Sequence, residues 1–312
     1  MAYPYNLPDI EKRFLPDDSW KIGEFTNQET NHNIHYSYSL TNEPIGTVII
    51  LPGLSEFSEK YIETVNFFNK RNYNCYVIDW AYQGRSSRFK KNNHKRYSDG
   101  YNSDISDLNK FIKNFAPNET PLYMLGHSMG AHIGLRYLAT QNHNIKAASF
   151  STPMLGILDL KYFPLFLSYL FKPFSSFYVP GGKNWHEGAR KNDGTDIFSS
   201  DPIRDAAHTQ WCLANSELQI GNATFKWLNE SLKSISFLKK RDVLDNIKIP
   251  TLLAYAGKET LVDNDAIKNA SMKIKSSIIL ELKNSKHEIL METDDIRDEF
   301  LNKTLALFNQ QD

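Results

Sequence analysis

The chain has 312 residues, of which 41% are hydrophobic and 23% are charged, as in an ordinary globular protein. Its 36 Lys and Arg residues are balanced by 36 Asp and Glu residues, so the net charge is zero. Because phosphate binding needs a surplus of cations, this balance argues against nucleic acid as a partner.

Strand-like and helix-like segments alternate along most of the chain. Runs rich in β-branched and aromatic residues predict eight strands, at residues 21–25, 33–40, 46–53, 73–80, 121–126, 145–153, 249–257 and 277–285. Amphipathic or capped segments predict helices at residues 59–72, 104–115, 131–141, 200–215, 223–233, 263–273 and 293–310. Such alternation is typical of a mostly parallel sheet with helices on both faces.

The alternation is interrupted between residues 154 and 245. This segment contains the aromatic stretch "YFPLFLSYLFKPFSSFY" at residues 162–178, followed by two helical pieces. Since the strand–helix pattern resumes afterwards, we expect one α/β core, residues 1–153 and 246–312, with a helical cap inserted at residues 154–245.

The sequence "LGHSMG" lies between a predicted strand and a predicted helix. Within it, Gly126-His127-Ser128-Met129-Gly130 fits the pattern G-x-S-x-G, in which a serine stands on a strained turn between two elements. Side chains at the two glycine positions would collide with the neighbouring strand and helix. The pattern predicts that Ser128 is a nucleophile, whereas the neighbouring His127 is expected to pack beneath the turn.

A serine nucleophile needs an acid and a histidine later in the chain, in that order. Glu259 follows the predicted strand 249–257, and His287 follows the last predicted strand. Because the loops at the carboxyl ends of parallel strands gather at one edge, these residues are expected near Ser128. Asp263 is an alternative acid, although it is expected to begin the next helix.

When a serine attacks a carbonyl group, the tetrahedral intermediate carries a negatively charged oxygen, the oxyanion. This oxyanion needs hydrogen-bond donors. One is predicted to be the backbone amide of Met129, the residue after the nucleophile. Gly53 lets the earlier loop "LPGLSEF" turn inward, and the amide of Leu54 in that loop is the second candidate.

These segments resemble an α/β-hydrolase of the bacterial lysophospholipase and monoacylglycerol-lipase branch. The matching pieces are "ILPGLSEFSEKY", "IDWAYQGRSSR", "LGHSMGAHIGLRYL", "STPMLGI", "SDPIR", "IGNATFKWLNES", "AGKETLVDN" and "KHEILMETDDIR". The resemblance implies the α/β-hydrolase fold, a Ser-His-acid triad, no cofactor and no metal, and a lysophospholipid or monoacylglycerol as the substrate. The sequence departs from the usual pattern of this family at three places. The oxyanion motif, which commonly begins His-Gly, begins here with Pro52-Gly53, and the acid, usually aspartate, is Glu259. The cap motif that resembles "GGPT" in relatives reads "GNAT" at residues 221–224.

The aromatic stretch at residues 162–178 has two interpretations. It is either the packed underside of the cap, or an acyl-chain pocket or a surface that touches a membrane peripherally. A packed cap that lines an acyl pocket, with Phe166 and Phe171 in contact with substrate, satisfies both. Alternatives to a lipid hydrolase are a short-chain carboxylesterase, an aminopeptidase-like amidase that binds the substrate amine through Glu217 or Asp201, and a non-catalytic binding protein on the same fold.

The cellular location is expected to be cytoplasmic. The first residues lack the apolar core of a signal peptide, and no stretch approaches the roughly 18 apolar residues of a membrane span. Cys75 and Cys212 lie far apart and outside any Cys-x-x-Cys pair, so both are expected to be reduced, buried thiols.

Overall fold

A computed structural model describes residues 3–116 and 119–310, apart from the side chains at positions 168, 169 and 171. The strands are β1 Trp20–Asn27, β2 His32–Ser39, β3 Gly46–Leu51, β4 Tyr73–Ile78, β5 Leu122–His127, β6 Ile145–Ser151, β7 Thr251–Ala256 and β8 Ser277–Leu282. They form one eight-stranded sheet in the order β1-β2-β4-β3-β5-β6-β7-β8. The pairs β1–β2 and β2–β4 are antiparallel and the other neighbours are parallel, so the expected mostly parallel sheet is confirmed.

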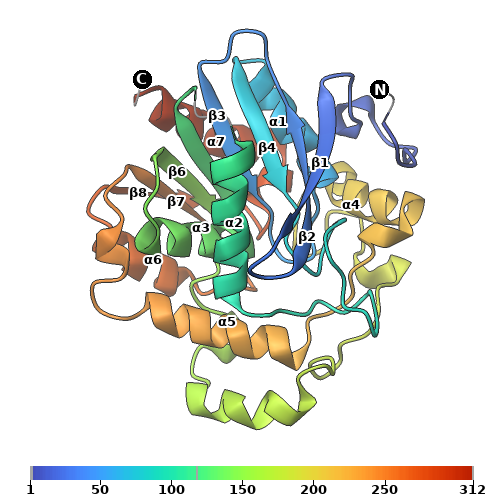
Figure 1. Cartoon of the computed structure of the whole chain (residues 1–312), viewed down its shortest axis with the longest axis vertical. Helices are drawn as coiled ribbons and strands as arrows, with labels where there is room; N and C mark the ends of the chain where they lie inside the picture. The colour runs from blue at the N-terminus through green and yellow to red at the C-terminus, as the bar shows by residue number, and fades with distance from the viewer. Residues whose placement is uncertain (1–2, 117–118, 311–312) are drawn as a thin grey trace.

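Helices cover both faces of this sheet (Figure 1). The α-helices are α1 Ile62–Asn69, α2 Tyr101–Phe115, α3 Ser128–Thr140, α4 Pro202–Ala214, α5 Phe225–Leu238, α6 Asn264–Lys273 and α7 Asp294–Asn309. Short 3-10 helices are η1 Lys12–Phe14, η2 Ser58–Tyr61, η3 Leu158–Leu160, η4 Leu165–Phe174, η5 Glu187–Ala189, η6 Ser216–Leu218, η7 Leu244–Asn246 and η8 Ile289–Met291.

The central strands are apolar on both faces because each face has its own helical layer. In β3, Ile49 and Leu51 pack in the core cluster that includes α2, α3 and α6, whereas Val48 and Ile50 pack in the cluster that includes α1 and α7. Successive side chains of a strand point to opposite faces, so a strand covered twice has to be apolar throughout. All six residues of β3 are buried.

Between β6 and β7 the described chain adds no strand to the sheet and forms α4, α5 and the 3-10 helices η3 to η7. Figure 1 shows α5 lying across one end of the sheet, with the yellow-green helix η4 on the far side of α5. Trp227 of α5 donates from Nε1 to Met129 Sδ at 3.4 Å, which places this helix over the predicted nucleophile turn. The division into core and cap at residues 154 and 245 stays a prediction.

Several helices differ from the sequence expectation in extent. Helix α3 starts at Ser128, three residues before the expected start, and α5 runs on to Leu238. The aromatic stretch, for which the sequence predicted no regular element, contains the 3-10 helix η4, and Pro173 lies inside it. Among the described residues, no helix combines the length and the apolar character needed to span a bilayer.

Candidate active site

Ser128 lies at the point where β5 gives way to α3. Its φ angle is +49°, in the left-handed region that side chains other than glycine adopt only at a cost in free energy. A Cβ atom on Gly130 would lie 2.2 Å from the carbonyl oxygen of Leu51, and one on Gly126 would lie 2.9 Å from the Cα of Ala131. The expectation of a strained serine between two glycines that have no room for side chains is confirmed.

Three of the predicted side chains meet at the carboxyl edge of the sheet. His287 lies on the loop after β8, and its Nε2 is 2.9 Å from Ser128 Oγ. The Nδ1 atom of the same ring is 2.7 Å from Glu259 Oε2, on the loop after β7. All three side chains are buried or nearly so. The geometry is that of a nucleophile, a base and a carboxylate that orients the base.

The Glu259 carboxylate is held by the backbone as well as by His287. Its Oε1 accepts hydrogen bonds from the amides of Thr260, Leu261 and Val262 at 2.9, 2.8 and 3.3 Å. Burial alone would raise the pKa of this group, but His287 and the amides outweigh burial and hold the pKa below its usual value. Glu259 is therefore an anion at neutral pH, with one oxygen reserved for the imidazole.

Asp263 is used differently. It is the N-cap of α6, where its Oδ1 accepts from the amide of Asp265 at 3.0 Å. The same oxygen lies 3.2 Å from Lys161 Nζ. A carboxylate at this position stabilises the helix N-terminus, as the sequence led us to expect. The alternative acid thus points to a helix end and a lysine, and Glu259 is the carboxylate beside His287.

The two candidate oxyanion donors lie in the first turn of α3 and in the loop after β3. Gln83 holds that loop, since its Nε2 donates to the carbonyl of Gly53 at 2.7 Å and its Oε1 accepts from the amide of Ser55 at 3.1 Å. Between these two contacts, the amide of Leu54 has no hydrogen-bond acceptor within the described part of the chain. The amide of Met129 belongs to a first helical turn, whose N–H groups have no acceptor inside the helix. Their role as an oxyanion hole stays a prediction.

His127 packs beneath the turn, as expected. Its Nδ1 is 2.9 Å from Ser151 Oγ and 3.2 Å from Thr152 Oγ1. Burial lowers the pKa of His127 to about 4, so the ring is neutral at physiological pH. Its ring centroid is 4.9 Å from that of His287. A neutral ring fills this space without placing a second positive charge beside the base.

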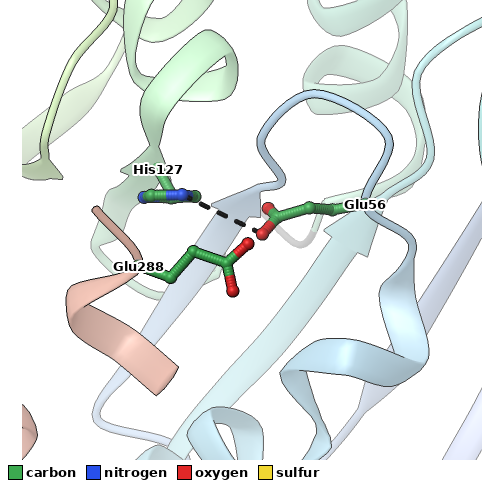
Figure 2. Close-up of side chains that lie close together, drawn as sticks. All are labelled: Glu56, His127 and Glu288. Atoms are coloured by element: carbon green, nitrogen blue, oxygen red, sulfur yellow. Dashed lines mark ion pairs between the residues drawn. The ribbon is translucent and has the colours of Figure 1, made fainter. Parts of the chain in front are cut away.

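A buried ionic cluster next to His287 has no counterpart in the sequence analysis. Figure 2 shows Glu56, His127 and Glu288 facing one another. The Lys60 ammonium contacts Glu56 Oε1 at 2.6 Å and Glu288 Oε2 at 2.7 Å, and Arg190 Nη2 contacts Glu288 Oε1 at 2.6 Å. The i, i+4 spacing of Glu56 and Lys60 was the available sequence signal for the first pair. Arg190 comes from the predicted cap, where nothing in the local pattern marks it.

Glu56, His127 and Glu288 also form a group of metal-ligating types, with ligand atoms within 4.8 Å of one another. The Lys60 ammonium already bonds to both carboxylates. Although burial alone would raise the pKa values of Glu56 and Glu288, Lys60 and Arg190 hold them below their usual range. The donor set therefore fits an ion-pair cluster with its own cations better than a metal site.

Ser128 and His287 open into a cavity of about 390 Å³, a size within the range of small-molecule sites. The apolar residues lining it are Leu54, Met154, Ile157, Val179, Trp185, Ala189, Phe198, Ile220, Ala223, Trp227, Leu228, Leu261 and Val262. Polar lining residues include Glu56, Arg190, His208, Thr209 and Glu288. One cavity thus combines a largely apolar wall with a small set of polar groups beside the reactive serine.

Phe166, expected to contact substrate, is not among the residues that line this cavity, and its contact with substrate stays a prediction. The Phe166 side chain is 69% exposed. The physical reason is the position of α5, which packs against η4 and separates it from the sheet. The Phe171 side chain lies outside the described residues.

The two carboxylates considered for binding a substrate amine are also outside the cavity lining. Glu217 is an exposed side chain paired with Arg85. Asp201 caps α4 and lies 2.8 Å from Arg204 Nη1. Neither is placed to receive an amine beside Ser128.

Comparison with known proteins places the chain among α/β-hydrolases. Over 289 residues it is 27% identical to the probable lysophospholipase L2 of Haemophilus influenzae, covering 89% of this chain and 90% of that one. It is 25% identical to lysophospholipase L2 of Escherichia coli K12, covering 84% and 80%. A soluble variant of monoglyceride lipase from Saccharomyces cerevisiae, solved with a substrate analogue, superposes with a TM-score of 0.72 at 16% identity, over 94% and 95% of the two chains.

The match to a family model is equally broad. Residues 42–294 fit the model of the family described as serine aminopeptidase, S33. This range includes Ser128, Glu259 and His287, the segment between β6 and β7, and six of the eight strands, β3 to β8. The chain therefore belongs to the serine aminopeptidase S33 family of α/β-hydrolases.

Proposed function

We propose that the protein is a serine hydrolase that cleaves the carboxylic ester of a single-chain lipid, a lysophospholipid or a monoacylglycerol. The observation that carries this proposal is the pair of contacts from His287 to Ser128 and to Glu259, at 2.9 and 2.7 Å, on the wall of a largely apolar cavity. The lysophospholipase names of the relatives support the same substrate class.

In the acylation step, Ser128 Oγ attacks the ester carbonyl carbon while His287 Nε2 takes the hydroxyl proton. Glu259 orients the ring through Nδ1 and stabilises the imidazolium that forms. The amides of Leu54 and Met129 donate to the oxyanion of the tetrahedral intermediate, and such a donor is typically worth about 3 kcal/mol. The imidazolium then gives its proton to the alcohol oxygen, the carbon–oxygen bond breaks, and the acyl group remains on Ser128.

In the deacylation step, a water molecule replaces the departed alcohol. His287 removes a proton from this water as its oxygen attacks the acyl carbon, and the same amides receive the second oxyanion. Collapse of the intermediate returns the proton to Ser128 Oγ and releases the fatty acid. The chain's own residues supply a nucleophile, a base and electrostatic stabilisation for both steps.

The apolar wall supports an acyl chain as the group that enters the cavity. Transfer of a methylene group from water to such a wall is worth up to about 0.8 kcal/mol. The short-chain esterase and the amidase are the alternatives on the same fold. The amidase is less well supported, because the cavity carboxylates Glu56 and Glu288 already bond to Lys60 and Arg190.

For the location of the protein, we propose that it is a cytoplasmic enzyme that works peripherally at a membrane. Its support is a group of exposed apolar side chains on and around η4, namely Tyr162, Phe166, Leu170, Phe174 and Phe177. Aromatic and aliphatic side chains of this kind insert at the boundary between headgroups and acyl chains. The two buried, unpaired cysteines fit a reducing compartment.

The test of the proposed function is the Ser128→Ala variant compared with Ser271→Ala, an exchange on the distant helix α6. Turnover of lauroyl lysophosphatidylcholine, monolauroylglycerol and p-nitrophenyl esters is measured together with labelling by a fluorophosphonate. We expect Ser128→Ala to lose turnover and labelling without a change in fold by circular dichroism, whereas Ser271→Ala resembles the parent. Labelling that persists in Ser128→Ala would assign the nucleophile elsewhere, and a parent protein that is neither labelled nor active would favour the non-catalytic binding protein.

A further inference from the structure

The residues on both sides of His287 are bound to one short segment of the predicted cap. This segment, residues 190–200, is called the strap below. His287 lies on the loop that connects β8 to η8, outside any helix or strand. The carbonyl of His287 accepts a hydrogen bond from Thr152 Oγ1 at 2.9 Å, and the amide of Lys286 donates to Glu292 Oε1 at 2.7 Å. The position of such a loop depends on the contacts of its neighbouring residues.

On one side of the histidine, the Lys286 ammonium binds three backbone carbonyls of the strap. Its Nζ donates to the oxygens of Gly194, Asp196 and Ser199 at 2.7, 2.5 and 3.1 Å. An ammonium group has three N–H donors, so the strap uses the whole donor capacity of this side chain.

On the other side, Glu288 binds the strap through its side chain and its backbone. Its carboxylate pairs with both ends of the Arg190 guanidinium, at 3.1 Å to Nη1 and 2.6 Å to Nη2. Its amide donates to the carbonyl of Phe198 at 2.8 Å. The Arg190 guanidinium lies 4.0 Å from the centroid of the Phe198 ring, so this ring limits the movement of the arginine.

The same carboxylate connects the strap to the oxyanion loop. Glu288 shares Lys60 with Glu56, and the two carboxylates face each other in Figure 2. Glu56 Oε2 in turn accepts a hydrogen bond from the backbone amide of Gly53, directly before Leu54. Contacts between buried, charged groups thus run from the strap to both loops that the proposed mechanism uses.

We propose that the strap positions the general base: Lys286 and the Arg190–Glu288 pair hold His287 at the distance that proton transfer from Ser128 requires. This inference rests on the proposed function, in which His287 is the base. Proton transfer needs a heavy-atom distance of about 2.6–3.2 Å, and a misplacement of about 1 Å can cost a hundredfold in rate. Lys286, Arg190 and Glu288 are positioning residues, because they act through the loop that carries the imidazole.

The main test is Lys286→Met, compared with Lys283→Met, which exchanges an exposed lysine of the same loop. Both are assayed on p-nitrophenyl acetate and p-nitrophenyl butyrate, with melting temperature as the measure of folding. We expect kcat to fall at least tenfold in Lys286→Met, with KM within about twofold of the parent, and Lys283→Met to match the parent. A raised KM at unchanged kcat would show that the strap binds substrate, and an unchanged kcat in folded Lys286→Met would overturn the proposal.

A second comparison separates positioning from a general loss of structure. In a His287→Ala background, the slow residual fluorophosphonate labelling no longer depends on the base, so Lys286→Met should not reduce it further. If Lys286→Met lowers the labelling rate by the same factor in the His287→Ala background as in the parent protein, Lys286 does not act through His287. Arg190→Gln, which leaves Glu288 paired with Lys60, gives an independent variant should Lys286→Met not fold, and the same loss of kcat at constant KM is expected.

The failure of this inference is distinguishable from the failure of the proposed function. If the parent protein neither hydrolyses esters nor reacts with the fluorophosphonate, both fall together. If the parent is active and folded Lys286→Met keeps the kcat of the parent, only the positioning role is wrong.

Discussion

At the scale of single residues, the surroundings of a carboxylate decide its role more than its chemical type does. Glu259 and Asp263 are four positions apart, yet one bonds to an imidazole and the other to a helix N-terminus. Three consecutive amides bind one oxygen of Glu259 and leave the other directed at His287. In the family that the sequence resembles, aspartate is usual at this position. Here the longer glutamate side chain lies at a hydrogen-bonding distance of 2.7 Å from the His287 ring.

This difference predicts a ranking of two isosteric variants. Glu259→Gln should lower kcat by a hundredfold or more, because the amide no longer stabilises the imidazolium and can favour the wrong tautomer. Asp263→Asn should change kcat less than about threefold, since asparagine is an equally good N-cap. The measurement is kcat on a soluble p-nitrophenyl ester for both variants, and the opposite ranking would transfer the role of acid to Asp263.

At the scale of elements, α5 determines which part of the predicted cap reaches the cavity beside Ser128. Its residues Trp227 and Leu228 line the cavity, whereas η4 packs on its outer side with Phe166 exposed. Both segments are apolar, but the apolar side chains of α5 face the cavity, whereas those of η4 lie on the outer surface.

The two segments should therefore respond to different assays. Leu228→Ser should flatten the rise of kcat/KM with acyl length from acetyl to lauroyl, because each methylene buried against the wall contributes up to about 0.8 kcal/mol. Phe166→Ser should leave this rise intact for dispersed esters and weaken turnover only when the substrate is held in phospholipid vesicles. All soluble substrates are kept below their aggregation concentrations.

Either of two results would contradict this division of roles. A parent protein whose kcat/KM is flat or falls with acyl length would favour the short-chain esterase. A loss of lauroyl preference in Phe166→Ser, with Leu228→Ser unaffected, would place the acyl chain on η4.

The strands of the sheet could be predicted from the sequence because strand patterns and turn residues are local features. All eight strands were found within a few residues, and so was the strained turn at Ser128. The cap was harder, since apolar residues 162–178 look the same in sequence whether they face a cavity or the outside. The Lys60–Glu288–Arg190 contacts join three distant parts of the chain, and no spacing rule connects residues that only the fold brings together.

At the scale of the whole molecule, several histidines are buried in their neutral form. Burial lowers the pKa of His127 to about 4 and that of His132 to about 3, and it depresses the pKa of His208 as well. In the unfolded chain these rings would take up protons near pH 6.5. As the pH falls below that value, the unfolded state binds more protons than the folded state, so the free energy of unfolding decreases.

His132 offers a direct test of this linkage. Its Nδ1 donates to the carbonyl of Met154 and its Nε2 accepts from Ser234, an arrangement that glutamine can imitate without titrating. Between pH 6.5 and 4.5, the melting temperature of His132→Gln should fall less steeply than that of the parent, whatever the absolute values at pH 7. Equal slopes for the two proteins would mean that His132 is not neutral in the folded state.

The order of the active-site residues along the chain has a consequence for protein synthesis. His287 follows Ser128 by 159 residues, and the predicted cap lies between them. At about 5–20 residues per second, a ribosome needs on the order of ten seconds or more to pass from one to the other. During this interval the growing chain carries Ser128 without His287, the base of the proposed mechanism. A newly made chain would therefore be unable to attack the lipids around it until β8 has left the ribosome and joined the edge of the sheet.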